Sequence, residues 1–145
     1  MQNTKNTPLR VAMGGLGAVG LPVVEWLDSG EEPGLQLVAV SAGDKERAAG
    51  RLAHLKTPPP VMELAELAAV ADVIVECAPP EHFLDVCGPA VEQGRILVPL
   101  SVSQLLHHMD LVDRARETGA TIVVPTGALV GLDTVRAAAE GNLRS

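Results

Sequence analysis

A glycine-rich hexapeptide near the start of the chain restricts its possible folds more than any other feature. The hexapeptide is Gly15-Leu16-Gly17-Ala18-Val19-Gly20, and it follows the mostly apolar residues 9–13, which are typical of a strand buried on both faces of a parallel sheet. After it, Val19, Val23 and Leu27 recur at helical spacing and predict a helix with one apolar face turned to that sheet. The order of strand, glycine loop and helix predicts the first unit of an α/β domain.

Each glycine of this loop removes a Cβ atom from a place where the chain would be crowded. We expect Gly15 to permit the tight turn, Gly17 to let the backbone approach a pyrophosphate, and Gly20 to let the helix pack closely on its strand. Unpaired backbone N–H groups at the helix start would face the phosphates, and the helix dipole adds a fractional positive charge there. The loop therefore predicts a dinucleotide site, and a glycine-rich turn without a ligand is the alternative.

Predicted strands and helices alternate along the remainder of the chain. Residues 61–70 are the least clear and suggest a short additional strand with one or two helical turns. The alternation is the pattern of right-handed βαβ units, so we expect an α/β fold with a doubly wound, Rossmann-type parallel sheet. Strands are expected over residues 35–40, 73–77, 96–98 and 121–124, and helices over residues 44–55, 81–93 and 104–118. The buried face of the helix that starts at residue 81 is predicted to comprise Phe83, Val86, Cys87, Ala90 and Val91.

Length and composition fit one compact domain of this class. The chain has 145 residues, of which 47% are hydrophobic, enough to form a core. Trp26 and Phe83 are its only aromatic residues of the Phe, Trp and Tyr types, which disfavours single-strand nucleic-acid binding because that relies on aromatic stacking. The formal net charge of -7 gives no attraction to phosphate backbones or anionic membranes. We therefore expect a small-molecule partner, with no nucleic acid and no membrane.

Signals for targeting, disulfides and metals are weak. No apolar stretch approaches the roughly 20 residues of a membrane span, and residues 1–7 lack the apolar region of a signal peptide, so a cytoplasmic location is expected. Cys77 and Cys87 are too few for a disulfide framework, and we expect reduced thiols. No cluster of His, Cys and Asp has the spacing of metal ligands, so no metal is expected.

The end of the second predicted strand is where the type of dinucleotide would be recognised. In such sheets the ligand lies across the carboxyl ends of the strands, and an NAD-binding protein usually has an acidic residue here for the ribose hydroxyls. In this chain the strand ends at Ser41, and the first acidic residue is Asp44. Ser41 with Lys45 and Arg47 could instead accept a 2′-phosphate, or the two cations could form the solvated face of a helix. The cofactor is therefore predicted as NAD or NADP.

The segments after the later strands are the other candidate walls of the site. Ala78 and Pro79 open a turn against which a flat ring could rest, although prolines there are also typical of a helix start. Ser101, after the next strand, is a further candidate. Glu76, at a buried strand end, is expected to find hydrogen-bond donors in a structural role.

The four histidines do not suggest a catalytic centre. None of His54, His82, His107 and His108 has a nearby nucleophile or carboxylate at a recognisable catalytic spacing, so solvated or structural roles are expected. His82 alone follows the proline turn and could face the cleft.

Taken in order, these segments resemble the L-aspartate dehydrogenase family, and the resemblance covers nearly the whole chain. The most specific segment is Pro125-Thr126-Gly127-Ala128 followed by Gly131-Leu132-Asp133. The resemblance implies an NAD(P)-dependent oxidoreductase that converts L-aspartate to iminoaspartate, which goes to oxaloacetate and ammonia or to quinolinate and NAD biosynthesis. The other matching segments are Arg10-Val11 with the glycine loop, Val75-Glu76-Cys77-Ala78 and Leu100-Ser101-Val102.

The resemblance also implies roles for individual residues. Gly15, Gly17, Ala18 and Val19 would hold the pyrophosphate, and Ala78, Pro79 and Ala128 would lie near the nicotinamide. Together with the strand-end candidates, the predicted cofactor-binding residues are Gly15, Leu16, Gly17, Ala18, Val19, Ser41, Ala78, Pro79, Ser101 and Ala128.

The chain departs from the family pattern in two ways. Ser41 stands where an acidic residue is common. The family also has a second α/β domain with the catalytic histidine and most substrate contacts, and we find no counterpart to that histidine here. We therefore expect a dinucleotide-binding domain over residues 1–125, a crossover segment with the start of the catalytic domain over residues 126–145, no assignable catalytic residue, and little turnover of aspartate by this chain alone.

Two other interpretations stay open. One is a different dehydrogenase or reductase, of the homoserine dehydrogenase or dihydrodipicolinate reductase type. The other is a nucleotide-binding or interaction module without catalysis. Leu132, Val135, Ala138 and Ala139 form an apolar face that the second domain of the family would cover, and for this chain alone the uncovered face predicts self-association, expected as a homodimer.

Overall fold

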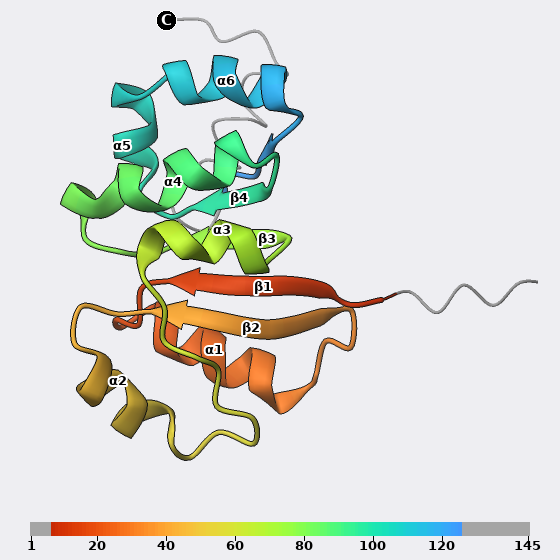
Figure 1. Cartoon of the computed structure of the whole chain (residues 1–145), viewed down its shortest axis with the longest axis vertical. Helices are drawn as coiled ribbons and strands as arrows, with labels where there is room; N and C mark the ends of the chain where they lie inside the picture. The colour runs from red at the N-terminus through yellow and green to blue at the C-terminus, as the bar shows by residue number, and fades with distance from the viewer. Residues whose placement is uncertain (1–6, 126–145) are drawn as a thin grey trace, which may run out of the picture.

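Residues 7–125, which the computed structural model describes, form a parallel sheet of five strands in the order β2-β1-β3-β4-β5 (Figure 1). This is one of the doubly wound strand orders, so the predicted fold class is confirmed. The crossover helix predicted within residues 126–145 lies outside the described residues. The strands are β1 (Leu9–Gly14), β2 (Leu35–Ser41), β3 (Val73–Glu76), β4 (Ile96–Pro99) and β5 (Thr121–Ile122).

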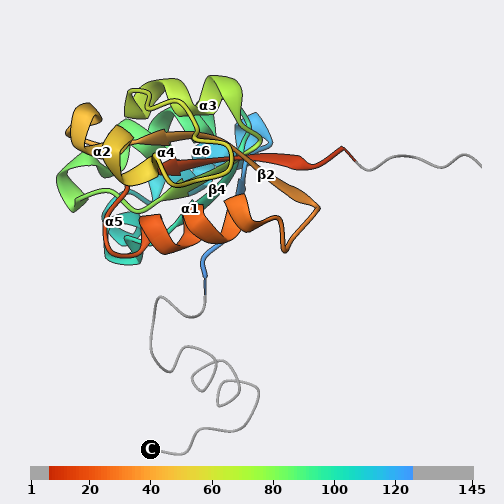
Figure 2. The same cartoon turned by 90° about the horizontal axis from the view of Figure 1, so that it is seen from below.

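Helices cover both faces of the sheet, with α1 on one face and α3 and α4 on the other (Figure 2). Successive side chains of β1 alternate between these faces: Val11 and Met13 pack with α1 and α2, whereas Ala12 packs with α3 and α4. No helix among residues 7–125 is long and apolar enough to span a membrane. The α-helices are α1 (Gly20–Ser29), α2 (Lys45–Leu52), α3 (Leu67–Val70), α4 (Phe83–Glu92), α5 (Val102–His107) and α6 (Asp110–Thr118), and the 3-10 turns are η1 (Leu64–Glu66) and η2 (Pro80–His82).

The additional strand suggested within residues 61–70 is reduced to a single bridge. Val61 pairs in parallel with Val40, through hydrogen bonds from Val40 N to Pro60 O (3.1 Å) and from Met62 N to Val40 O (2.8 Å). The run of prolines at 58–60 explains why the pairing does not extend, because proline has no N–H to donate to a strand ladder. The helical turns predicted for this segment are present as η1 and α3.

The prediction of a single helix over residues 104–118 is wrong, because the chain forms two helices there. Helix α5 ends before His108, which leaves the helical conformation at φ -126° and ψ 50°, and α6 begins at Asp110. The His108 ring stacks on Phe83 with 5.8 Å between the ring centroids, so tertiary packing accompanies the break. Gly119 ends α6 in the left-handed conformation, which glycine adopts readily at the end of a helix.

The helix that follows the glycine loop buries part of the predicted face: Leu27 is buried and Val23 is half-buried against the core, but Val19 is not part of that face. Gly20, Val24 and Leu27 are buried, whereas Val19 is 54% exposed because it precedes the first helical residue. For α4, all five predicted core residues are buried. Helix α2 ends at Leu52 instead of residue 55, and its start is capped by Asp44, whose carboxylate accepts a hydrogen bond from Arg47 N at 2.9 Å.

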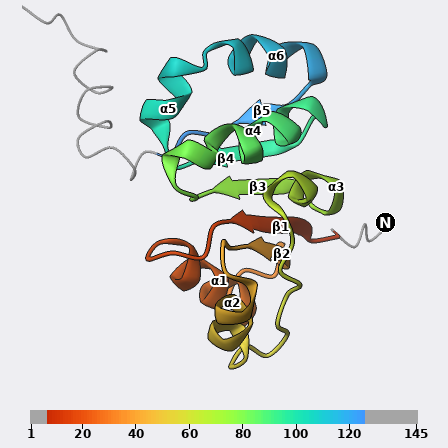
Figure 3. The same cartoon turned by 60° about the vertical axis from the view of Figure 1, so that its left-hand side comes forward.

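Because the strands are parallel, their carboxyl ends lie at one edge of the sheet (Figure 3). Ser41, Gly14, Glu76 and Pro99 occupy adjacent register positions across β2, β1, β3 and β4. The residues that follow these four positions are therefore brought together in space, although the sequence separates them widely.

Candidate functional site

Two glycines of the loop are required by the fold itself. Gly15 has φ +136°, and a Cβ added to it would lie 2.4 Å from the Cys77 carbonyl oxygen. A Cβ on Gly20 would lie 2.3 Å from the Gly15 carbonyl oxygen, so α1 can approach the loop only with glycine at this position. Both observations agree with the predicted roles in turning the chain and packing the helix.

Gly17 has no such requirement. Its φ does not lie in the positive range, and a Cβ added to it would meet no heavy atom within 4 Å. Gly17 is exposed and lines two neighbouring cavities. The described residues therefore leave bare backbone next to open space at this point of the loop, which is the arrangement that a closely approaching phosphate needs.

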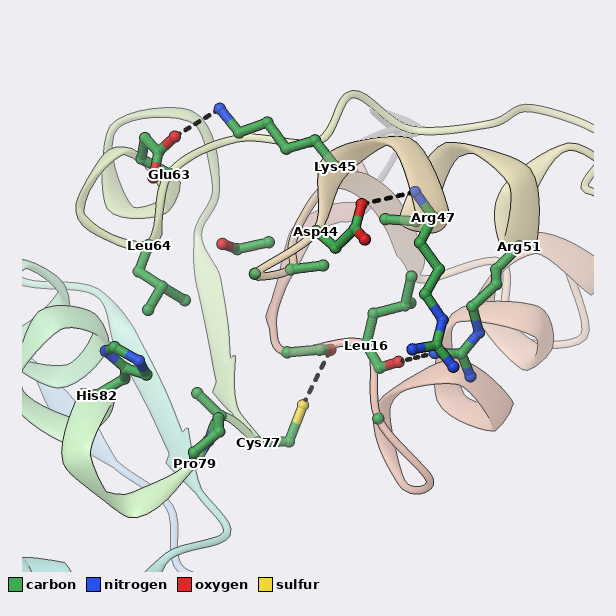
Figure 4. Close-up of a pocket in the computed structure, with 17 residues that line it drawn as sticks. Leu16, Asp44, Lys45, Arg47, Arg51, Glu63, Leu64, Cys77, Pro79 and His82 are labelled. Carbon is green, nitrogen blue, oxygen red and sulfur yellow. Dashed lines mark hydrogen bonds and ion pairs between the residues drawn. The ribbon is translucent and has the colours of Figure 1, made fainter.

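The larger cavity, of about 640 Å³, lies between the glycine loop, the segment after β2 and the turn after β3 (Figure 4). The smaller one, of about 230 Å³, lies between the loop and the segment after β4, and shares Gly17, Cys77 and Ala78 with the larger one. Of the predicted site residues, Gly15, Leu16, Gly17, Ser41, Ala78 and Pro79 line the larger cavity. Ala18, Val19 and Ser101 line the smaller one with Gly17 and Ala78. The predicted Ala128 lies outside the described residues.

The charged residues after β2 are arranged differently from the predicted phosphate site. Lys45 forms an ion pair with Glu63 at 2.5 Å, so its ammonium is already neutralised by a carboxylate (Figure 4). Arg51, which the sequence analysis missed, lines the cavity and donates a hydrogen bond from Nη1 to the Leu16 carbonyl oxygen at 2.6 Å. The signal that could have found it is its position four residues after Arg47, which places both on one face of α2.

The turn after β3 is tied to the glycine loop through a cysteine. Cys77 Sγ donates to the Gly15 carbonyl oxygen at 3.3 Å. Burial, with a smaller contribution from the Glu76 carboxylate, raises the pKa of the Cys77 thiol to about 12. Both cysteines are free, and burial also raises the pKa of Cys87, so neither is a thiolate near neutral pH.

Glu76 joins the end of β3 to the segment after β4. It is fully buried, and its carboxylate accepts hydrogen bonds from Ser101 N at 2.9 Å and from Ser101 Oγ at 3.0 Å. The structural role predicted for Glu76 agrees with these two contacts. They hold Ser101 against the smaller cavity, where the sequence placed a candidate wall.

Two of the four histidines are half-exposed and contact a carboxylate, in pairs that the sequence analysis did not name. His82 Nδ1 lies 3.0 Å from Asp85 Oδ2, and His54 Nε2 lies 3.0 Å from Glu25 Oε1. His82 also lines the larger cavity, whereas His54 does not (Figure 4). Within residues 7–125 no group of His, Cys, Asp and Glu side chains could hold a metal ion.

Sequence comparisons place the chain among dinucleotide-binding proteins. Residues 15–125 match the family described as "Homoserine dehydrogenase, NAD binding domain". L-aspartate dehydrogenase of Bradyrhizobium diazoefficiens is 44% identical, and the match covers 98% of this chain and 50% of that protein. L-aspartate dehydrogenase 3 of Bordetella bronchiseptica is 42% identical over 94% of this chain and 50% of its own length. The chain thus spans about half the length of the curated relatives it matches.

Solved structures show the same fold at low sequence identity. A biliverdin reductase from Synechocystis sp. PCC 6803, in complex with biliverdin and NADP+, has a TM-score of 0.69 and 19% identity over 93% of this chain and 43% of its own. A homoserine dehydrogenase from Thiobacillus denitrificans has a TM-score of 0.68 and 18% identity over 81% of this chain and 29% of its own. The chain belongs to the family of the homoserine dehydrogenase NAD-binding domain, and its predicted resemblance to L-aspartate dehydrogenases is confirmed along nearly its whole length.

Proposed function

We propose that this chain binds NAD or NADP as the cofactor-binding part of an L-aspartate dehydrogenase. The observation that carries the proposal is Gly17, whose lack of a side chain is explained by neither backbone conformation nor packing. It lies where two cavities meet at the carboxyl edge of a parallel sheet. A dinucleotide pyrophosphate in contact with the loop backbone accounts for glycine at this position.

The proposed roles follow the two cavities. The backbone of residues 15–19 would bind the pyrophosphate, with the partial positive charge at the start of α1. Ala78, Pro79 and Ser101 would form the wall on the nicotinamide side, joined by Ala128 on the resemblance alone. When bound, the nicotinamide supplies the hydride chemistry, and the protein's part is to bind and orient it.

We further propose L-aspartate, a dicarboxylic amino acid, as the substrate and iminoaspartate as the product. Support comes from the similarity to proteins named L-aspartate dehydrogenase over 98% and 94% of the chain. These relatives are about twice as long as the matched segment, so we assign the catalytic histidine and most substrate contacts to their remaining part. The dinucleotide-binding unit is proposed to end near residue 125, where the family match also ends.

A chimera tests this proposal. The chain is joined to the part of the Bradyrhizobium diazoefficiens protein that the match leaves uncovered, and reduction of NAD+ or NADP+ is followed with L-aspartate or L-homoserine. We expect aspartate-dependent reduction by the chimera, and binding of reduced dinucleotide without turnover by the chain alone. A folded chain that binds neither dinucleotide contradicts cofactor binding, and a chimera that oxidises homoserine in preference to aspartate contradicts the substrate.

We also propose a homodimer and a cytoplasmic location. Support for the dimer is the apolar spacing of Leu132, Val135, Ala138 and Ala139, which lie outside the described residues. Sedimentation equilibrium measures the association, and a monomer across the concentration range contradicts it.

A further inference from the structure

Two arginines that line the larger cavity lack the carboxylate partner that Arg10, Arg114 and Arg116 have; within residues 7–125 Arg95, away from the cavity, also has none and donates instead to the Ala68 carbonyl oxygen. Arg10 and Arg114 contact carboxylates at 2.7 Å, and Arg116 does so at 2.6 Å. Within residues 7–125, neither Arg47 nor Arg51 contacts a carboxylate with its guanidinium, and both line the cavity. Two cations without a carboxylate at the wall of one cavity, in a chain of net charge -7, favour an anionic ligand that comes from outside the chain.

The geometry of α2 brings these two guanidiniums to the same place. Arg47 and Arg51 are four residues apart, and their side chains run from α2 toward Leu16 (Figure 4). The hydrogen bond from Arg51 Nη1 to the Leu16 carbonyl oxygen fixes that guanidinium beside the glycine loop. A guanidinium has five N–H donors, so further donors remain for a ligand. Like charges at this spacing repel each other, and a bound anion would relieve the repulsion.

The other charged groups around the cavity are already engaged. Lys45 and Glu63 neutralise each other, and Asp44 uses one carboxylate oxygen to cap α2. The strand end nearest to these residues carries Ser41, which is neutral, 3% exposed and part of the cavity wall. A carboxylate on the last residue of this strand would bind ribose hydroxyls and repel a phosphate; this chain has Ser41 there, and its first carboxylate, Asp44, follows three residues later.

We propose that Arg47 and Arg51, beside the neutral Ser41, bind a phosphate group on the adenosine ribose, so that the chain prefers NADP(H) to NAD(H). This inference rests on the proposed function, because it assigns the type of dinucleotide at the same site. The sequence analysis named Lys45 as a possible phosphate contact, and this inference assigns that role to Arg51 instead.

Paired titrations of the 145-residue chain with NADPH and NADH test the inference. Calorimetry in a phosphate-free buffer gives both Kd values, and their ratio isolates the added phosphate because all other contacts are common to the two ligands. We expect NADPH to bind about 10-fold to 100-fold more tightly than NADH, the range for one or two charge-assisted hydrogen bonds. Arg47→Gln and Arg51→Gln should each lower the ratio by about 10-fold.

Arg116→Gln is the matched control, because Arg116 lies on α6 and already pairs with Asp113. It should leave the ratio unchanged. NADH binding as tightly as NADPH overturns the inference and leaves the proposed function standing. A ratio that neither Arg47→Gln nor Arg51→Gln changes overturns the assignment to these arginines. If circular dichroism shows a folded chain that binds neither ligand, the inference and the proposed function both fail.

Discussion

At the scale of single residues, three glycines of one loop are present for different physical reasons. Gly15 and Gly20 are enclosed by the Cys77 and Gly15 carbonyl groups, so the folded chain itself excludes a side chain at both positions. Gly17 faces open space, and we attribute the absence of a side chain at this position to a ligand that contacts the backbone. The spacing of the motif predicted all three positions, but their separate reasons became visible only in the packed structure.

Alanine substitutions separate these reasons. Gly17→Ala is expected to change the free energy of unfolding by no more than about 1 kcal/mol. It should weaken binding of NADPH or NADH about 10-fold or more, because the new methyl group keeps the loop backbone from the phosphates. Gly20→Ala should lower the free energy of unfolding by about 1–3 kcal/mol or more, through overpacking against the loop. Urea unfolding and dinucleotide titration measure the two effects.

Gly88→Ala is the control for these variants. A Cβ added to Gly88 on α4 also meets no atom within 4 Å, but Gly88 lines neither cavity. It should leave dinucleotide binding unchanged. Unaltered binding by Gly17→Ala would contradict the role given to Gly17.

At the scale of elements, polar contacts hold both ends of the central strand β3. Glu76 at the carboxyl end of β3 holds Ser101 after β4. At the other end, Asp72 just before β3 accepts hydrogen bonds from Arg10 N, Nε and Nη2 at 2.9, 3.1 and 2.7 Å. The first contact shapes the candidate site, and the second lies at the opposite edge of the sheet.

Removing the Glu76 carboxylate tests the first contact. Glu76→Ala leaves a buried hole and two unpaired groups of Ser101, so we expect a loss of about 2–4 kcal/mol in the free energy of unfolding. Glu76→Gln keeps one oxygen acceptor and gains an NH₂ group that can donate a hydrogen bond to the Ser101 hydroxyl. It should lower the free energy of unfolding by only about 1 kcal/mol. Urea unfolding of both variants measures the difference, and equal losses would argue against the hydrogen bonds.

The Arg10–Asp72 contact makes stability depend on pH. The hydrogen bond from Arg10 lowers the pKa of Asp72 from 3.8 to about 2. A lowered pKa stabilises the folded chain above pH 3.8, and this stabilisation is lost as the pH falls toward about 2. Asp72→Asn should therefore melt at a lower temperature than the unmodified chain above about pH 5, with a difference that shrinks below about pH 4. A difference independent of pH in thermal melts would refute this explanation.

At the scale of the whole molecule, the charge of the cavity opposes that of the chain. The chain carries a net charge of -7, whereas three cationic side chains and two carboxylates line the larger cavity, counting Lys, Arg, Asp and Glu. A dinucleotide with an added phosphate carries more negative charge, so its binding should depend more on salt.

Ionic strength tests this electrostatic asymmetry. Between about 0.01 M and about 0.15 M salt, over which the Debye length falls from about 30 Å to about 8 Å, the affinity for NADPH should fall more than that for NADH. Titrations at both salt concentrations measure the change. Equal losses for the two ligands would mean that the added phosphate does not lie beside Arg47 and Arg51.

Much of this molecule could be predicted from the sequence by local rules. The doubly wound class, the buried face of α4 and the glycine stop of α6 all follow from periodicity and turn residues within a short window. The break between α5 and α6 could not be predicted in this way, because residues 104–118 continue one apolar pattern and the break accompanies stacking of His108 on the distant Phe83.

The sequence by itself determined the order of elements, the class of the fold and the glycine loop that lines the larger cavity, because neighbouring residues encode these features. The tertiary structure alone decided which charges face that cavity. Lys45 forms an ion pair with Glu63, and Arg51 donates a hydrogen bond to the Leu16 carbonyl oxygen, 35 residues earlier in the sequence. Contacts between distant segments depend on how the elements pack, and they leave no periodic pattern in the chain.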